Sequence, residues 1–105
     1  MAKQTARSDE SLKERLPQLL LERGMSIRAL ARAVGVNQSH LSRVLGAEGS
    51  RPASRELAAA LATALDLPTD YFPEFRRGVV IEALDADQHL RDRIYDSIKR
   101  GLPKR

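Results

Sequence analysis

The chain lacks cysteine and tryptophan altogether, and its 105 residues include only two tyrosines and two phenylalanines. Without cysteine it has no disulfide framework and no thiolate metal site. Scarce aromatic residues, beside abundant leucine, alanine, arginine and glutamate, favour an all-helical chain over a sheet. No apolar run approaches the roughly 20 residues that span a membrane, and residues 1–11 have no signal-peptide segment. We therefore expect a cytoplasmic protein of one domain, without membrane contact.

The histidines and acidic residues form no pattern that supports catalysis. His40 and His89 are far apart in the sequence and lack the His-x-x-x-His spacing that holds zinc on one helix face. No glycine-rich phosphate loop, nucleophile elbow or close acid pair follows a predicted strand. We therefore expect a protein that is not an enzyme and that needs neither a metal nor a cofactor.

The positive charge is concentrated in one part of the chain. The formal net charge is +4, and between Gly24 and Arg55 five arginines stand against Glu48 alone. This stretch accounts for the whole excess, since the remaining basic and acidic residues balance. A charge that served solubility alone would have no reason to gather there, so the pattern favours contact with the phosphates of a nucleic acid.

Within this basic stretch, Ser26–Leu45 predicts two short helices joined by a tight turn. Ser26 is a suitable N-cap, and aliphatic residues follow it at helical spacing up to Val34. Gly35 then ends the first helix, because glycine adopts the left-handed backbone conformation at little cost, and Asn37 caps the second helix. The inward positions expected of the pair are Ile27, Leu30, Ala31, Val34, Val36, Leu41, Val44 and Leu45.

This arrangement of a small residue, a turn glycine and inward aliphatic residues resembles the helix-turn-helix of the phage-repressor-like (Cro/XRE) family. The resemblance covers residues 12–72. It implies an all-α fold, a five-helix lambda-repressor-like DNA-binding domain, to which this chain adds a C-terminal amphipathic helix. It also implies a transcriptional regulator that binds double-stranded DNA sequence-specifically, with helix 37–45 in the major groove. Pro17 and Ile27 depart from the family pattern, and we assign no phosphate contact to Ile27.

The outward side chains of the second helix are the candidates for DNA contact. Gln38 is the best base reader, since its amide pairs bidentately with adenine N6 and N7. Further contacts to bases or nearby phosphates are expected from Ser39, His40 and Arg43. Contacts that position the protein on phosphates are expected from Arg28, Asn37, Ser42 and Arg51.

Capping residues, prolines and glycines divide the chain into three predicted segments. Residues 1–10 predict a flexible N-terminal arm, residues 11–73 the DNA-binding domain, and residues 74–105 a C-terminal extension. Tyr71 and Phe72 are expected in the core of the domain rather than at a ligand. The local signals are a capping box at Ser11–Glu14, a helix kinked at Pro17 and closed by Gly24, a cap at Ser54, and a capped one-turn helix at Thr69–Phe72.

The C-terminal extension contains a clear amphipathic helix over residues 88–100, with Leu90, Ile94 and Ile98 on one face. The preceding residues 75–84 fit either a helix or a short extended segment, since they combine a glycine with consecutive β-branched residues. The 88–100 helix needs a surface for its apolar stripe. That surface is its own domain, the same helix of a second subunit, or another protein. Because DNA readers of this type use two half-sites, we expect a homodimer.

Two other classes of function remain open. In one, the chain is a protein-interaction module, such as a toxin-neutralising antitoxin with autoregulatory DNA binding, whose C-terminal helix binds the partner. In the other, it is an architectural DNA binder with little sequence preference. A long toxin-wrapping tail would favour the first class, and none is evident. Dense lysine would favour the second class, and lysine is scarce here.

Overall fold

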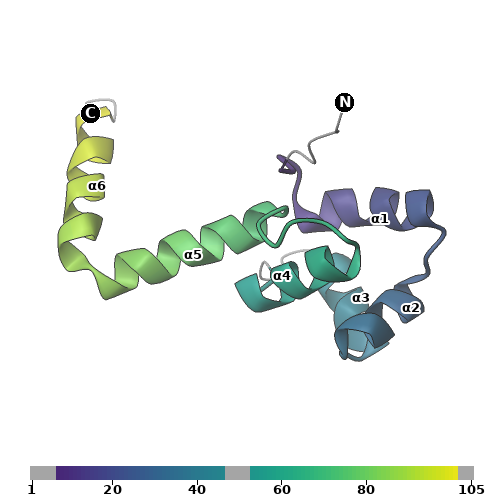
Figure 1. Cartoon of the computed structure of the whole chain (residues 1–105). Coiled ribbons are helices and arrows are strands. Elements are labelled where there is room, and N and C mark those ends of the chain that lie inside the picture. Colours follow the sequence, from purple (N-terminus) through teal and green to yellow (C-terminus); the bar gives the residue numbers. More distant parts are fainter. Residues whose placement is uncertain (1–6, 47–52, 102–105) are drawn as a thin grey trace.

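The computed structural model describes residues 7–46 and 53–101, and every regular element in these ranges is an α-helix (Figure 1). The all-α fold predicted from the sequence, with an additional helix at its C-terminal end, is confirmed. The helices are α1 (Leu12–Arg23), α2 (Ile27–Val34), α3 (Gln38–Gly46), α4 (Arg55–Ala64), α5 (Pro73–Ala86) and α6 (Gln88–Gly101).

Local capping signals begin and end the helices of the domain where the sequence predicts. In three caps, a serine Oγ accepts a hydrogen bond of 3.0–3.2 Å from the backbone N–H three residues further on. α1 runs without interruption through Pro17, and Gly24 ends it with a φ of 60°. The predicted single helix through Pro17 is therefore confirmed. The serine caps are Ser11 on α1, Ser26 on α2 and Ser54 on α4.

The segment between α4 and α5 differs from its prediction. Residues 69–72 form a turn rather than the expected one-turn helix. The Tyr71 carbonyl oxygen accepts from the distant Ser8 N–H at 2.8 Å, and Arg76 Nη1 donates to the carbonyl oxygens of Asp70 at 2.8 Å and Tyr71 at 3.0 Å. The fifth helix starts instead at Pro73, where the fixed φ of proline suits the first helical position. It continues to Ala86, so the stretch that fitted either a helix or an extended segment is helical.

The core lies among α1–α4 and is closed by the aromatic pair that precedes α5. Tyr71 and Phe72 are buried, with their rings edge to face at a centroid distance of 5.1 Å, so their predicted core role is confirmed. Arg15 Nε donates to the Tyr71 hydroxyl at 3.0 Å, and this hydrogen bond raises the pKa of the Arg15 guanidinium. The buried aliphatic residues are Leu12, Leu16, Leu19, Leu30, Ala31, Leu41, Ala58, Leu61, Ala62 and Leu65.

The base of α5 is tied to the start of the domain. Ser8, within the expected N-terminal arm, is buried; its backbone N–H donates to Tyr71 O at 2.8 Å, and its carbonyl accepts from Arg76 Nη2 at 2.7 Å. The Glu74 carboxylate accepts from the backbone N–H of Leu12, with oxygens at 3.0 and 3.1 Å, and so stabilises the positive end of the α1 dipole. Residues 1–6 lie outside the described ranges. The described part of the arm therefore packs with α5 against the domain.

Beyond its base, α5 projects from the domain and α6 turns sharply at its far end (Figure 1). The molecule accordingly extends 49 × 39 × 28 Å along its principal axes.

One close crossing holds the first half of α5 on α4. A Cβ atom on Gly78 would lie only 2.7 Å from Arg55 Cβ, and one turn further on Glu82 Oε2 lies 2.7 Å from Arg55 Nε. The crossing thus needs glycine and is fastened by an ion pair.

Candidate nucleic-acid interface

The α2 and α3 helices are locked together by a tight turn. Gly35 ends α2 with a φ of 76°, and the Val36 N–H donates to Ala31 O at 3.0 Å as the chain leaves the helix. Asn37 Oδ1 accepts from the His40 N–H at 3.2 Å and caps α3, as predicted. Ala31 and Leu41 are buried where the helices meet, at 2% and 0% exposure. The orientation of α3 is therefore fixed by the core.

Because Leu41 points into the core, the polar residues of α3 face solvent. All four candidates for base contact are exposed, and this one short helix brings them together. α2 and α3 together carry three arginines and no acidic residue, so their surface attracts phosphates. The exposed base-contact candidates are Gln38, Ser39, His40 and Arg43.

The residues expected on phosphates flank this helix. Arg28 is exposed near the start of α2, and Ser42 is exposed on α3. Asn37 is also exposed, but its side-chain oxygen is engaged as the α3 cap, which leaves its amide NH₂ group for a phosphate. Arg51 lies outside the described residues.

One contact in this surface was not predicted from the sequence. Arg28 Nε lies 3.5 Å from Gln38 Oε1, so the guanidinium of α2 donates to the side-chain amide at the start of α3. The sequence indicates both residues individually, but it gives no signal for a side-chain pair that spans ten positions across the turn. The contact links a candidate phosphate-binding residue to the best candidate base reader.

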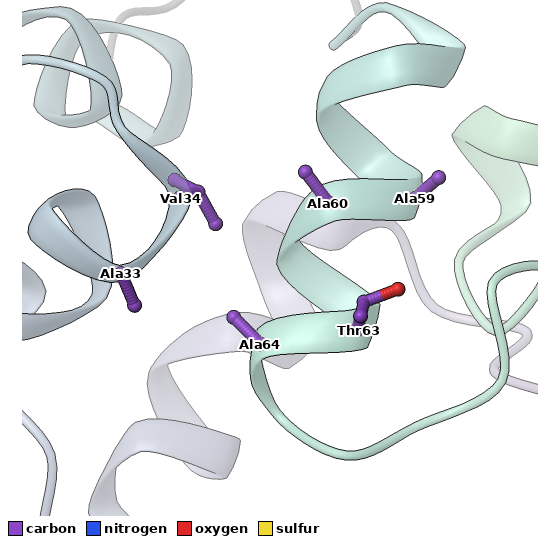
Figure 2. A pocket seen from close by; sticks show the side chains of 6 residues that line it. All are labelled: Ala33, Val34, Ala59, Ala60, Thr63 and Ala64. Carbon is purple, nitrogen blue, oxygen red and sulfur yellow. The ribbon is translucent and has the colours of Figure 1, made fainter.

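An open hollow of about 460 Å³ lies between α2 and α4 (Figure 2). Its walls carry no ionisable group, and among the lining side chains one threonine hydroxyl is the only polar group. Within residues 7–46 and 53–101, no three His, Asp or Glu side chains gather as a metal site, and no helix has the length and hydropathy of a membrane span. The hollow is lined by Ala33, Val34, Ala59, Ala60, Thr63 and Ala64.

Two buried helix contacts, a glycine turn and a polar outer face on the second helix define a helix-turn-helix protein. In agreement, a family model described as a helix-turn-helix domain matches residues 11–75, more than half of the chain. The chain belongs to this family, and the resemblance to helix-turn-helix domains of the Cro/XRE type is confirmed. Membership suggests a DNA-binding regulator. No curated protein and no solved structure matches the chain significantly.

Proposed function

We propose that this protein is a sequence-specific transcriptional regulator that inserts α3 into the major groove of double-stranded DNA. The observation that carries the proposal is the division of α3 into two faces. Leu41 is fully buried, while the polar and basic residues on either side of it are exposed. Because the inner face of α3 is fixed in the core, its outer face presents hydrogen-bonding groups in a fixed orientation, as base reading requires.

Within the groove, Gln38 reads adenine, because its amide donates to N7 and accepts from N6 at the same time. Further base or nearby phosphate contacts come from the other exposed residues of α3: Ser39, His40 and Arg43. The phosphates on either side are contacted by Arg28, Asn37 and Ser42, together with Arg51. These phosphate contacts supply affinity and register, whereas the base contacts supply the sequence preference.

We further propose that the protein binds as a homodimer. A single helix-turn-helix covers one half-site, and two half-sites about 34 Å apart place both recognition helices on the same side of the duplex. We also propose a cytoplasmic location, because a regulator of this kind must have access to double-stranded DNA.

The experiment that tests this function is selection of bound sequences from a random duplex library at near-physiological salt. We expect an enriched motif with two-fold symmetry, whose spacing gives the distance between half-sites. A double variant, Gln38→Ala with Arg43→Ala, is the matched control and should lose the enrichment while remaining folded, since both side chains are exposed. Binding that is weak, steeply salt-dependent and without enrichment would instead indicate an architectural binder.

The phosphate role of Arg51 has its own measurement. Arg51→Ala should weaken binding to all sequences alike and lower the slope of log affinity against log salt by about one. A slope equal to that of the unmodified protein would contradict the assignment.

A further inference from the structure

Arg43 holds the outermost position on α3. The core fixes the orientation of this helix, because Leu41 is fully buried. An α-helix turns by about 100° per residue, so Arg43 lies about 160° around the helix from Leu41. Ser39, four residues earlier, shares this outward face, and both residues are exposed. Arg43 therefore points away from the core, in the direction in which α3 enters the major groove under the proposed function.

The other exposed polar residues of α3 take different directions. His40 and Ser42 lie about 100° from Leu41 on opposite sides of the helix, which turns them towards the phosphates of the two strands that border the groove. Gln38 is the first residue of α3 and approaches the bases from the end of the helix. Arg43 is the one arginine or lysine of α3, and it is directed at the floor of the groove, where the base edges lie.

No described group of the protein occupies the Arg43 side chain. In the described part of the chain, no hydrogen bond or ion pair involves its guanidinium group. The guanidinium groups of Arg15, Arg55 and Arg76, by contrast, are engaged by Tyr71, a carboxylate and backbone carbonyl oxygens, respectively. The N–H donors of Arg43 are therefore available to a ligand, and neither α2 nor α3 carries an acidic residue that would compete for them.

We infer that Arg43 reads a guanine in each half-site, and that its guanidinium group donates to O6 and N7 of that base. The inference rests on the proposed function and names one base of its DNA site. In the major groove, guanine presents two acceptors side by side, and the planar fork of a guanidinium group matches them. Adenine presents one acceptor beside a donor, cytosine a donor and thymine one acceptor, so none of them pairs with arginine in this way.

The spacing along α3 also limits where this guanine lies. Gln38 and Arg43 are five residues apart in the chain. Five residues of helix rise by about 7.5 Å, and successive base pairs are about 3.4 Å apart. The guanine should therefore lie within about three base pairs of the adenine that Gln38 reads.

The first test measures base preference in the site selected from the random duplex library. Arg43→Ala should lower the preference for guanine at one position of each half-site by about 5- to 150-fold and leave the other positions unchanged. Arg32→Ala, at an exposed arginine of α2, removes the same charge and should alter no base preference. If Arg43→Ala instead weakens binding to all sequences alike and lowers the salt slope by about one, Arg43 is a phosphate contact and the inference is wrong.

The second test changes the DNA and leaves the protein intact. Each guanine of the selected site, on both strands, is replaced in turn by its deaza analogue, in which a C–H group takes the place of the N7 acceptor. At one position of each half-site, the replacement should weaken binding of the unmodified protein roughly tenfold or more and leave the affinity of Arg43→Ala unchanged. A selected site without guanine, or one in which no replacement distinguishes the two proteins, overturns the inference.

These results separate the assigned base from the proposed function. A two-fold-symmetric motif without an Arg43-dependent guanine would leave the sequence-specific regulator intact and refute the guanine contact. The absence of any enriched motif would refute both. Thermal melting of the free Arg43→Ala protein should match that of the unmodified protein, because the side chain is exposed, and so excludes unfolding as the cause of any lost preference.

Discussion

Arg28 of α2 and Gln38 of α3 meet across the helix-turn-helix, where the guanidinium Nε lies 3.5 Å from the amide Oε1. The contact is at the long end of hydrogen-bonding distances, so it orients the amide without holding it tightly. Arg28 occupies only one of the two lone pairs of the amide oxygen, so this oxygen can still accept from adenine N6 while the NH₂ group donates to N7. The pair therefore couples a residue expected on the backbone of DNA to a residue expected on its bases.

Gln38→Ala should lower the preference for adenine at one position of each half-site. The expected loss is about 1–3 kcal/mol of discrimination, the usual value of a bidentate base contact. Stability should change by less than about 0.5 kcal/mol, because the side chain is exposed. Competition binding with single-base variants of the selected site, and thermal melting of the free protein, measure the two effects. Gln88→Ala, an exposed glutamine of α6, is the control; unfolding of the Gln38 variant would contradict its position on the surface.

Arg28→Ala should lower the salt slope of binding by about one, because one phosphate contact is lost. Unlike Arg51→Ala, it should also alter base preference at the Gln38 position, because the amide loses its partner. Affinity measured over a salt series for the preferred and the substituted site tests both statements. Arg77→Ala, at an exposed arginine on α5, should leave the slope unchanged. If Arg28→Ala and Gln38→Ala act additively on base preference, the side-chain pair has no role in recognition.

Ala31→Leu should destabilise the domain by about 1–3 kcal/mol through overpacking. Ala31 is 2% exposed where α2 meets its neighbours, so a larger side chain has no room there. Ala33→Leu provides a matched control, since Ala33 is exposed on the same helix. Chemical denaturation of both variants is the measurement. Equal stability of the two would be incompatible with the close crossing of α2.

Gly78→Ala should destabilise the protein even though alanine favours a helix over glycine by about 1 kcal/mol. The added methyl group would lie 2.7 Å from Arg55 Cβ, which is close to the backbone and has little freedom to move. Gly101→Ala is the control, because a Cβ there meets nothing within 4 Å and should be tolerated. A gain in melting temperature at Gly78 would show that α5 is not held against α4 as the structure has it.

The helix boundaries of the domain were predictable because their causes are local. A serine or asparagine three residues before a helical N–H, as at Ser26 and Asn37, identifies a cap without knowledge of the rest of the fold. The turn at residues 69–72 was not predictable, since the Tyr71 carbonyl oxygen accepts a hydrogen bond from the N–H of Ser8, which is distant in the sequence. Local propensity favoured a helix there, and a tertiary contact overrode it.

The candidate site likewise has one part that could be predicted from the sequence and one part that could not. The polar face of α3 was predictable, because burial of Leu41 leaves the residues on either side of it to solvent. The Arg28–Gln38 contact was not, because it depends on the angle between two helices rather than on the spacing within one. The direction of α5 was likewise hidden, since the ion pair between Arg55 and Glu82 joins helices separated by a turn.

The carboxylate of Glu74 on the N–H of Leu12 has a consequence for how the chain folds. These residues are 62 positions apart, yet the contact completes the first turn of α1. A helix whose opening turn relies on so distant a residue gains its full stability only after a long loop has closed, which raises contact order and slows folding. On the ribosome, α1 emerges first but receives this stabilisation only when the start of α5 has been synthesised and has docked.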